Sequence, residues 1–482
     1  MQTCHTIKEY SDLFVQTSNN NDYQTVDIAD DEWEYLSDND NSAETILQYF
    51  RKTNKVTVTT GIEKQRTVVL DNFESLDISE SIGNNRRGHI INTGQSIWGL
   101  DFVPQPTPAN DNARQSRNKR AKIEADITTE YLAVGGYNST EEHHSLDEER
   151  SAEDQYNAIQ IYELSSFTET AKAKSKIRLC MCILHDYGVV VDLKWCPFSI
   201  FNENRKLGIL VILLNDGSSI VLVVPCPEYV RKKLALSKKV TDKVVHIRVK
   251  KPRLTLTMDN SLSGSVTVQK INKYTCFSWG GNKLAYGTMR GDIVVWNMVK
   301  SLQQNIPSLH IMIPSSFHLP VRCISWRSHF DPFILFWSDL DGNFIVHDLR
   351  DPYVPFRIFR TRQPFARITG PGHGTGFLYA DSDQVVRKNV YFNTKKGAAV
   401  TVNHGQIWDI AVSPHNDVAL TVSANGLALA KAFKKGNDEY SNGNHRYIPQ
   451  CTIYHLTSVP ESNTYIYLDS DEPMVNLIST RL

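Results

Sequence analysis

Short apolar runs alternate with polar turns along most of the chain, and this pattern predicts β-strands rather than helices. The stretch "WSDLDGNFIVHDLRDP", from Trp337 to Pro352, reads as a strand, a tight Asp-Gly turn and a second strand that ends at a proline. The most apolar stretch, Leu207 to Pro225, is interrupted in its middle by Asn-Asp-Gly. It therefore predicts a hairpin of two buried strands, each too short to span a bilayer.

The same order of strands and turns recurs along the sequence. Each copy has a short strand and a polar turn, then a strand with Ala, Leu or Phe, a turn rich in Asp, Asn or Gly, and a β-branched strand. The equivalent positions at the end of the first strand are Phe102, Trp195, Trp279, Trp326, Gly370 and Val412. The last four are about 45 residues apart, near the period of roughly 40–45 residues that is typical of WD40 propeller blades.

These repeats predict an all-β fold, a WD40-type β-propeller over residues 55–482. A four-stranded blade buries neither face alone, whereas blades stacked around an axis bury both. Six internal copies and one blade shared by strands from both ends of the chain predict seven blades, and the doubled intervals before Trp279 leave six or eight as alternatives. We expect polar insertions near residues 105–130, 138–156 and 226–253.

Residues 1–54 are polar and acidic, and they predict a largely disordered N-terminal extension. The segment "DIADDEWEYLSDND" interleaves carboxylates with Trp33 and Tyr35. Such a segment has too little apolar surface to fold by itself. An acidic tract that carries aromatic residues can act as a docking peptide, and a solvated tail is the alternative.

The repeats retain only part of the signature residues of the WD40 repeat. "IVVWNM" places a Trp where the Trp-Asp pair normally falls, and "IVHDLR" keeps the Asp but has His in place of the Trp. In WD40 repeats a His before the first strand joins a hydrogen-bonded network with a hydroxyl, a turn Asp and the Trp. We expect a structural network here, and its candidate members are His318, Asp341, Asp292 and Trp296.

Charge changes the picture only locally, because the net charge of the chain is −1 and gives no overall steering toward nucleic acid or membrane. Neutralising phosphates with Lys and Arg is the main source of sequence-independent affinity for nucleic acid. Candidates for nucleic-acid or partner binding are Arg231, Lys232, Lys233, Lys238, Lys239, Arg357, Arg360, Arg362 and Arg367. If the two segments meet they make one positive patch; otherwise they are two ordinary solvated loops.

A third basic cluster lies in a polar loop, and it fits nuclear import or phosphate contact. The residues of this cluster are Arg117, Lys119, Arg120 and Lys122. A plain surface loop is the alternative interpretation.

The sequence does not predict an enzyme. It has no Gly-rich phosphate loop, no Gly-x-Ser-x-Gly elbow and no His-Glu-x-x-His motif. Its eight cysteines lack Cys-x-x-Cys spacing, which favours a reduced intracellular setting without disulfides or zinc. We therefore expect no cofactor, no metal and no catalytic residue; a propeller hydrolase is the weaker alternative.

The order of several short sequence segments between Ile97 and Phe433 is similar to that of a known family. "IWGLDFVP" and "VVDLKWCP" are followed by "TCFSWGGNKLAYGTMRGDIVVWNM" and "FHLPVRCISWRSHFDPFILFWSDLDGNFIVHDLRDP". This order resembles the larger WD40 subunit of transcription factor IIIC, the family of general transcription factor IIIC polypeptide 2. In yeast the corresponding subunit belongs to the B-box-binding half of the factor, the tau complex.

The resemblance implies a nuclear, non-catalytic scaffold in RNA polymerase III transcription. The family supports recognition of the internal promoter (B box) of tRNA-type genes and recruitment of the initiation factor. The implied partners are the second WD40 subunit, the large DNA-binding subunit and promoter DNA as part of the complex, without a membrane. A WD40 adaptor of another nuclear or chromatin complex is the alternative. The family's N-terminal region is often longer and more basic and could contact DNA. In this chain the region is short and acidic, which argues against direct DNA contact by the tail.

Overall fold

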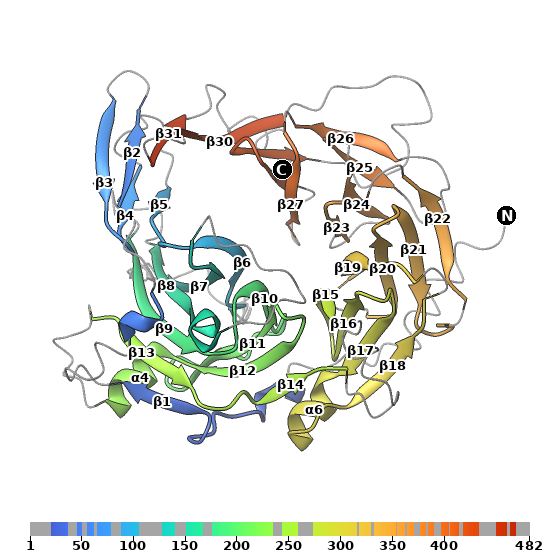
Figure 1. The fold of residues 1–482 in the computed structure, drawn as a ribbon, viewed down its shortest axis with the longest axis horizontal. Coiled ribbons are helices and arrows are strands. Elements are labelled where there is room, and N and C mark those ends of the chain that lie inside the picture. Colours follow the sequence, from blue (N-terminus) through green and yellow to red (C-terminus); the bar gives the residue numbers. More distant parts are fainter. Residues whose placement is uncertain are drawn as a thin grey trace, which may run out of the picture. The chain divides into compact units, whose positions relative to one another are not determined.

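The structure is a computed structural model in which nearly all regular elements are β-strands (Figure 1). This confirms the all-β prediction. The structure describes residues 21–36, 46–50, 55–61, 65–78, 88–105, 128–139, 151–166, 176–234, 243–258, 273–315, 318–328, 332–352, 354–361, 364–370, 376–381, 384–389, 397–403, 405–413, 418–432, 450–459 and 463–468. In these parts of the chain, no helix has the length and apolar character that a membrane crossing requires.

The chain divides into two compact units. The N-terminal unit comprises residues 23–257 and 458–466, and the C-terminal unit comprises residues 1–22, 258–457 and 467–482. In both units most neighbouring strands of a sheet are antiparallel and follow one another in sequence. The C-terminal end of the chain thus contributes to both units.

The C-terminal unit consists of four consecutive meanders of four antiparallel strands, yellow to red in Figure 1. The first is β15 (Tyr274–Gly280), β16 (Lys283–Thr288), β17 (Ile293–Asn297) and β18 (Leu309–Ile313), with helix α6 (Met298–Gln304) before β18. The second is β19 (Val321–Trp326), β20 (Ile334–Asp339), β21 (Asn343–Asp348) and β22 (Phe356–Arg360). The others are β23 (Ile368–Thr369), β24 (Phe377–Ala380), β25 (Val385–Asn389) and β26 (Ala398–Val402), then β27 (Ile407–Val412), β28 (Val418–Ser423), β29 (Leu427–Ala432) and β30 (Gln450–Val459).

The first strands of consecutive meanders lie against one another, β15 on β19, β19 on β23 and β23 on β27. A Cβ added to Gly280 would lie 2.7 Å from the Trp326 indole, so this close approach requires glycine. Five of the six repeat positions fall on the last or second-to-last residue of a first strand, and Gly370 directly follows β23. The repeat in the sequence therefore marks the start of each meander.

Aromatic packing between the second and third meanders is dense. The Phe344 ring of β21 stacks on Phe377 of β24 with ring centroids 4.1 Å apart, and it also meets Phe336 and Phe365. All four side chains are almost completely buried. Stacked and tilted aromatic pairs add to the free energy gained from burying their area, so this cluster is a strong contact between neighbouring sheets.

The N-terminal unit contains two larger sheets. In one sheet the order is β1 (Trp33–Leu36), β13 (Val245–Val249), β9 (Lys176–His185), β8 (Asn157–Ser166), β7 (Thr128–Tyr137) and β6 (Ser96–Phe102). In the other sheet the order is β10 (Val190–Trp195), β11 (Lys206–Leu214), β12 (Ser219–Pro225) and β14 (Leu254–Leu256). The remaining elements are α2 (Asn21–Gln24), β2 (Val56–Thr60), β3 (Arg66–Leu70), β4 (Ser75–Asp77), β5 (His89–Ile91), a 3-10 turn (Ala152–Gln155), α4 (Pro227–Lys233) and part of β31 (Thr464–Leu468).

The apolar hairpin expected between Leu207 and Pro225 is present as β11 and β12, and every residue of both strands is buried. Gly217, in the Asn-Asp-Gly turn, has φ of 80°, a left-handed conformation that glycine adopts without strain. Both ends of the chain meet in this unit, because the Thr57 N–H donates to the carbonyl of Asn463 at 3.2 Å. The Asn463 amide in turn donates to the Lys55 carbonyl at 2.7 Å.

Two segments are more ordered than the sequence indicates. Part of the region near 226–253, expected to be an insertion, forms α4 and β13, and β13 pairs in parallel with β9. Within the extension expected to be disordered, residues 21–36 fold onto the same sheet, since β1 pairs antiparallel with β13. The acidic stretch lacks a core of its own, and it acquires one from a strand more than 200 residues away.

The aromatic cluster yields a test of how strongly neighbouring meanders are coupled. We expect Phe344→Ala to lower the free energy of unfolding by about 3–5 kcal/mol, because it leaves a cavity among buried rings. Phe356→Ala, at a position of β22 that is 47% exposed, is the matched control and should cost far less. Urea unfolding monitored by tryptophan fluorescence measures both; equal losses for the two variants would contradict this account.

Candidate interaction site

The acidic residues near the N-terminus lie on the basic connector that follows β12. We call residues 21–36 the N-terminal strap; it comprises α2, a connecting loop and β1. Its strand lies along β13 with Trp33 opposite Val249 and Leu36 opposite His246. The acidic segment thus pairs with a strand of its own chain.

Apolar side chains anchor the strap at both ends. Tyr23 is fully buried and stacks on Phe198 with ring centroids 5.8 Å apart. Trp33 is 2% exposed and belongs to the core cluster that also contains Ile247 and Trp195. Fully burying a large apolar side chain is worth roughly 1.5–3 kcal/mol, so the strap is an integral part of the unit.

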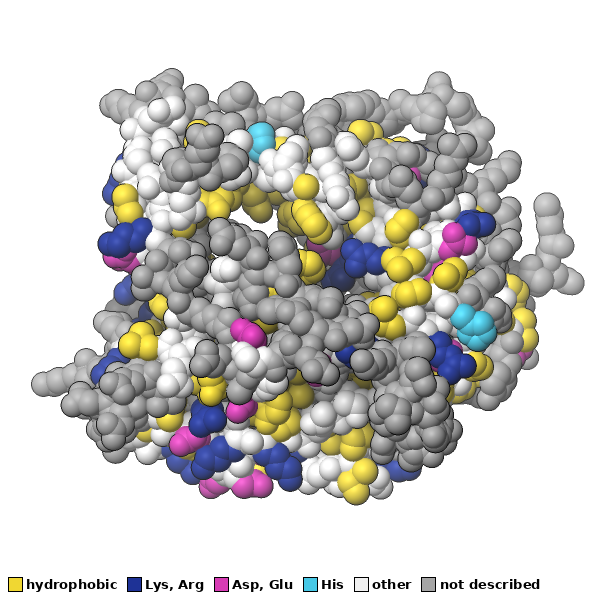
Figure 2. Space-filling model, viewed as in Figure 1, with side chains coloured by type: hydrophobic (Ala, Val, Ile, Leu, Met, Phe, Trp, Pro, Cys, Tyr) yellow, Lys and Arg dark blue, Asp and Glu magenta, His cyan; other side chains and the backbone are white. Residues whose placement is uncertain are grey.

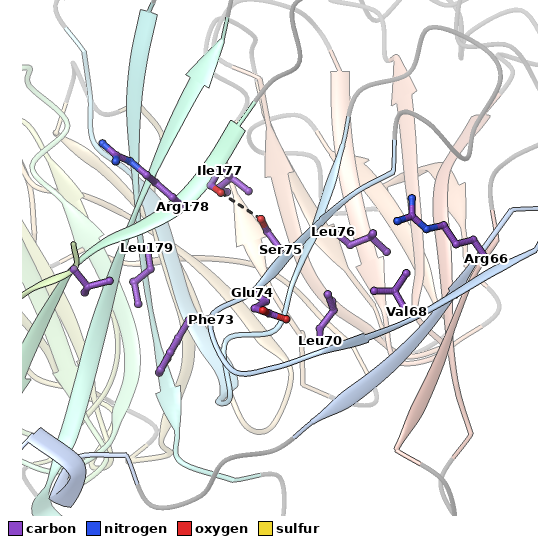
Figure 3. Close-up of a pocket in the computed structure, with 11 residues that line it drawn as sticks. Arg66, Val68, Leu70, Phe73, Glu74, Ser75, Leu76, Ile177, Arg178 and Leu179 are labelled. Atoms are coloured by element: carbon purple, nitrogen blue, oxygen red, sulfur yellow. Dashed lines mark hydrogen bonds between the residues drawn. The ribbon is translucent and has the colours of Figure 1, made fainter. Parts of the chain in front are cut away.

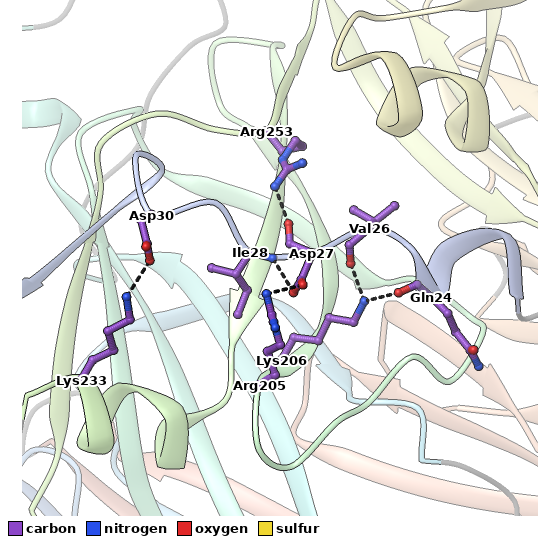
Figure 4. Close-up of polar contacts among 9 residues, drawn as sticks. All are labelled: Gln24, Val26, Asp27, Ile28, Asp30, Arg205, Lys206, Lys233 and Arg253. Atoms are coloured by element: carbon purple, nitrogen blue, oxygen red, sulfur yellow. Dashed lines mark hydrogen bonds and ion pairs between the residues drawn. The ribbon is translucent and has the colours of Figure 1, made fainter.

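Four carboxylates of the strap face four basic side chains of the unit. Asp27 pairs with Arg205, Asp30 with Lys233 at 2.8 Å, Glu32 with Arg253, and Glu34 with Arg248 at 3.8 Å; Figure 4 shows the first two pairs. Glu34 and Arg248 are also direct cross-strand partners in the β1–β13 ladder, an arrangement in which opposite charges stabilise a sheet. The hydrogen bond from Lys233 to Asp30 raises the pKa of the Lys233 amine.

Two basic side chains, Lys206 and Arg253, bind the strap backbone (Figure 4). The buried Lys206 amine donates to the Gln24 carbonyl at 3.1 Å and to the Val26 carbonyl. Arg253 donates through Nη2 to the Asp27 carbonyl at 2.6 Å. Burial lowers the pKa of Lys206, and its carbonyl partners supply the hydrogen bonds that a buried ammonium needs.

The Glu32–Arg253 pair is the most enclosed of the four, with side chains 8% and 11% exposed. Burial raises the pKa of Glu32, and the Arg253 hydrogen bond and charge partly offset this effect. The carboxylate is therefore tolerated at neutral pH because Arg253 is present. Removing one partner of a buried pair leaves a charge that is expensive to bury.

Ion pairs within the chain occupy two residues of the first predicted binding cluster. Arg231 is 6% exposed and pairs with Glu228, and Lys233 holds Asp30. Lys232 is exposed and donates to Asn204 Oδ1 at 3.1 Å. Lys238 and Lys239 lie outside the described residues. Figure 2 shows basic and acidic side chains next to each other along the edge where Figure 1 places β1 and α4.

The second predicted cluster belongs to the C-terminal unit, so neither unit by itself carries the joint patch. The exposed Arg360 pairs with Asp341, and Arg367 pairs with Asp409 at 2.9 Å. Arg357 lies in β22. The remaining predicted positions, Arg362 and the possible import cluster Arg117, Lys119, Arg120 and Lys122, lie outside the described residues.

The predicted repeat network is distributed over separate contacts. Asp292 accepts the Ser315 N–H at 2.9 Å, and the His318 N–H donates to the Ser315 hydroxyl at 3.2 Å. Trp296 donates to the Tyr274 hydroxyl at 3.1 Å. The structure thus joins Asp292 and His318 through one serine, and it places Trp296 and Asp341 in other contacts.

In the β20–β21 turn, sequence reasoning singled out Asp341 and missed Asp339. The buried Asp339 carboxylate accepts the N–H groups of Asp341 and Asn343, each at 3.0 Å, and the Asn343 amide at 2.7 Å. Sequence reasoning also missed the bond from Trp337 Nε1 to His347 Nδ1, at 2.8 Å. The His in "IVHDLR" was the available signal for that bond.

The described cavities do not assemble catalytic groups. A groove of about 500 Å³ lies between β3, β4 and β9, with mostly apolar walls that include Leu70, Leu76 and Leu179 (Figure 3). In its wall the Ser75 hydroxyl donates to the Ile177 carbonyl at 3.3 Å. Among the described residues, no group of His, Cys, Asp and Glu side chains is placed to hold a metal ion. The seven described cysteines are all buried.

Part of the chain is similar to a known transcription factor subunit. The chain is 24% identical over 282 residues to "Transcription factor tau subunit sfc6" of Schizosaccharomyces pombe, which is 56% of this chain and 38% of that protein. The chain thus spans less than two fifths of the length of this relative. No family model matches the chain. The similarity supports a distant relationship to a transcription factor subunit, and that relative is not an enzyme by its name.

The enclosed ion pair predicts that Arg253→Ala destabilises the N-terminal unit. We expect a loss of about 3–5 kcal/mol in the free energy of unfolding, because Glu32 would remain buried without its cation. Lys251→Ala, at a neighbouring exposed lysine, is the control and should change stability little. The double variant Glu32→Gln/Arg253→Met should recover most of the loss. Urea unfolding decides; a small effect of Arg253→Ala would contradict the assignment.

The Trp337–His347 bond predicts a pH dependence. Burial lowers the pKa of His347 to about 4, below the unfolded value of about 6.5. Its neutral form therefore stabilises the fold fully above pH 6.5, and this contribution is lost as the pH falls toward 4. We expect wild type to lose about 3 kcal/mol more than His347→Gln over this range. Urea titrations from pH 7 to 4 measure the difference, and parallel curves would refute it.

Proposed function

We propose that this chain is a non-catalytic scaffold subunit of a transcription factor of the tau type, which is transcription factor IIIC. The observation that carries the proposal is the similarity to a tau subunit, which extends over more than half of the chain. The order of the short repeated sequence segments between Ile97 and Phe433 supports the larger WD40 subunit as the specific counterpart. In this proposal the meanders are blades of a WD40-type propeller, with seven as the proposed number.

A scaffold role agrees with what the described residues offer. The charged groups of the strap described above bind other parts of the same chain. The cysteine thiols are poor nucleophiles, because burial raises the pKa of Cys182 to about 12 and that of Cys226 to about 11. These properties favour the binding of macromolecules over catalysis.

The proposed setting is the nucleus, in RNA polymerase III transcription. The subunit would support recognition of the internal B box of tRNA-type genes and recruitment of the initiation factor. Its proposed partners are the second WD40 subunit, the large DNA-binding subunit and, through the complex, promoter DNA. The family resemblance supports these details.

For DNA contact we propose the exposed part of the predicted basic clusters. Lys232 is exposed, and its bond to a neutral asparagine leaves its charge uncompensated, in contrast to Arg231 and Lys233. Lys238 and Lys239 extend the same basic segment in the sequence. Charge reversal at Lys232, Lys238 and Lys239 should weaken DNA affinity of the assembled complex and flatten its salt dependence. An unchanged salt slope would remove this part of the proposal.

The decisive experiment is purification of the tagged full-length chain from nuclei, followed by mass spectrometry of what elutes with it. We expect the other subunits of the tau-type factor to elute with the chain at moderate salt. The Lys251→Ala chain, stable by the argument above, is the control and should retrieve the same set. Elution alone, or with subunits of another nuclear or chromatin complex, would refute the assignment and favour a different WD40 adaptor.

A further inference from the structure

A small polar pocket in the C-terminal unit has the features of a binding site. Its volume is about 350 Å³, and it lies where the starts of β19 and β27 meet the loop before β23 and the β24–β25 turn. The lining residues are Arg322, Pro364, Phe365, Ala366, Asp381, Gln384, Gln406 and Ile407. They come from three consecutive meanders, so the pocket exists only in the folded unit.

Arg322 carries the uncompensated charge of this pocket. Its side chain is exposed, and no carboxylate of the described residues lies within ion-pair distance of it. The other charges nearby are already paired. Arg387 donates to Asp381 Oδ2 at 2.5 Å, and Arg367 binds Asp409 at 2.9 Å.

Two glutamines flank this cation on rigid backbone. The Asn403 N–H donates to the Gln384 carbonyl and the Ala424 N–H donates to the Gln406 carbonyl, each at 2.8 Å, while both glutamine side chains are exposed. Gln384 has φ of 61°, a left-handed conformation that is uncommon for a residue other than glycine. Backbone strain of this kind gathers at binding sites, where the surrounding structure holds it in place.

We propose that this pocket binds an Asp or Glu side chain on a peptide segment of a partner protein. The Arg322 guanidinium can bind a carboxylate in bidentate fashion, and the amides of Gln384 and Gln406 can donate to its remaining lone pairs. The buried Phe365 and Ile407 form apolar walls for the neighbouring part of the peptide. The proposal rests on the proposed scaffold role only for the kind of partner, another protein subunit.

Charge favours a peptide over nucleic acid at this position. A phosphate backbone brings a regular row of negative charges and requires several cations along its path. Here one arginine without an ion-pair partner among the described residues lines the pocket, while the neighbouring cations Arg387 and Arg367 are already paired with Asp381 and Asp409. One isolated carboxylate matches one isolated guanidinium.

Binding of labelled peptides to the purified full chain tests the proposal. The probes are a fluorescein-labelled peptide with a single glutamate flanked by tyrosines, the same peptide with glutamine in place of that glutamate, and a labelled 20-base-pair DNA duplex; binding is followed by fluorescence anisotropy. We expect the glutamate peptide to bind at least tenfold more tightly than the glutamine peptide. Arg322→Gln should remove about tenfold of that affinity, and Gln406→Ala several-fold. Lys300→Gln, which removes an exposed charge on α6 of the same unit, should leave the affinity unchanged.

Each possible outcome supports or overturns the site. Equal affinity of wild type and Arg322→Gln, or of the two peptides, would overturn it. Arg322-dependent binding of the duplex in preference to the peptide would assign the pocket to nucleic acid and overturn it as well. Because Arg322 is exposed, the urea unfolding midpoints of the variants should match. The peptide affinity of Gln406→Ala provides a second, independent test of the site. The measurement uses the chain alone, so it is independent of which subunits elute with the chain from nuclei.

Discussion

The need to cover both faces of each β-meander governs this structure. Strands such as β11, β12 and β16 are buried along their whole length, which means that their sheets are covered on both sides at these strands. A four-stranded sheet with two apolar faces cannot be stable alone, so consecutive sheets must pack on one another. Glycine at position 280 and large aromatic residues such as Trp326 and Phe344 set how closely they approach.

Charge then decides which surfaces remain available. The N-terminal strap supplies four carboxylates to four basic side chains, and the most basic stretch of the described sequence becomes largely self-neutralised. Exposed pairs of this kind contribute little stability, whereas the enclosed Glu32–Arg253 pair fixes the path of the strap. The strap therefore compensates part of the positive charge of α4 and β13.

These two constraints agree with the proposed role, in which the protein acts through its surfaces. The buried thiols and buried histidines have pKa values shifted by burial alone or mainly by burial, which is typical of structural positions. The unpaired charges and exposed amides lie instead at turns and strand ends, as at Arg322, Gln384 and Gln406. A distant relationship to a transcription factor subunit agrees with this distribution.

The strands and repeats followed from the sequence because they depend on local alternation and on turn residues such as Gly217 and Gly342. The sequence by itself therefore determined the all-β class and the start of each meander. It could not determine the partner of Arg253, since Glu32 lies 221 residues away in the chain. Only the tertiary structure decided which charges are paired and which, like Arg322, remain exposed, because ion pairing depends on proximity in space and leaves no period in the sequence.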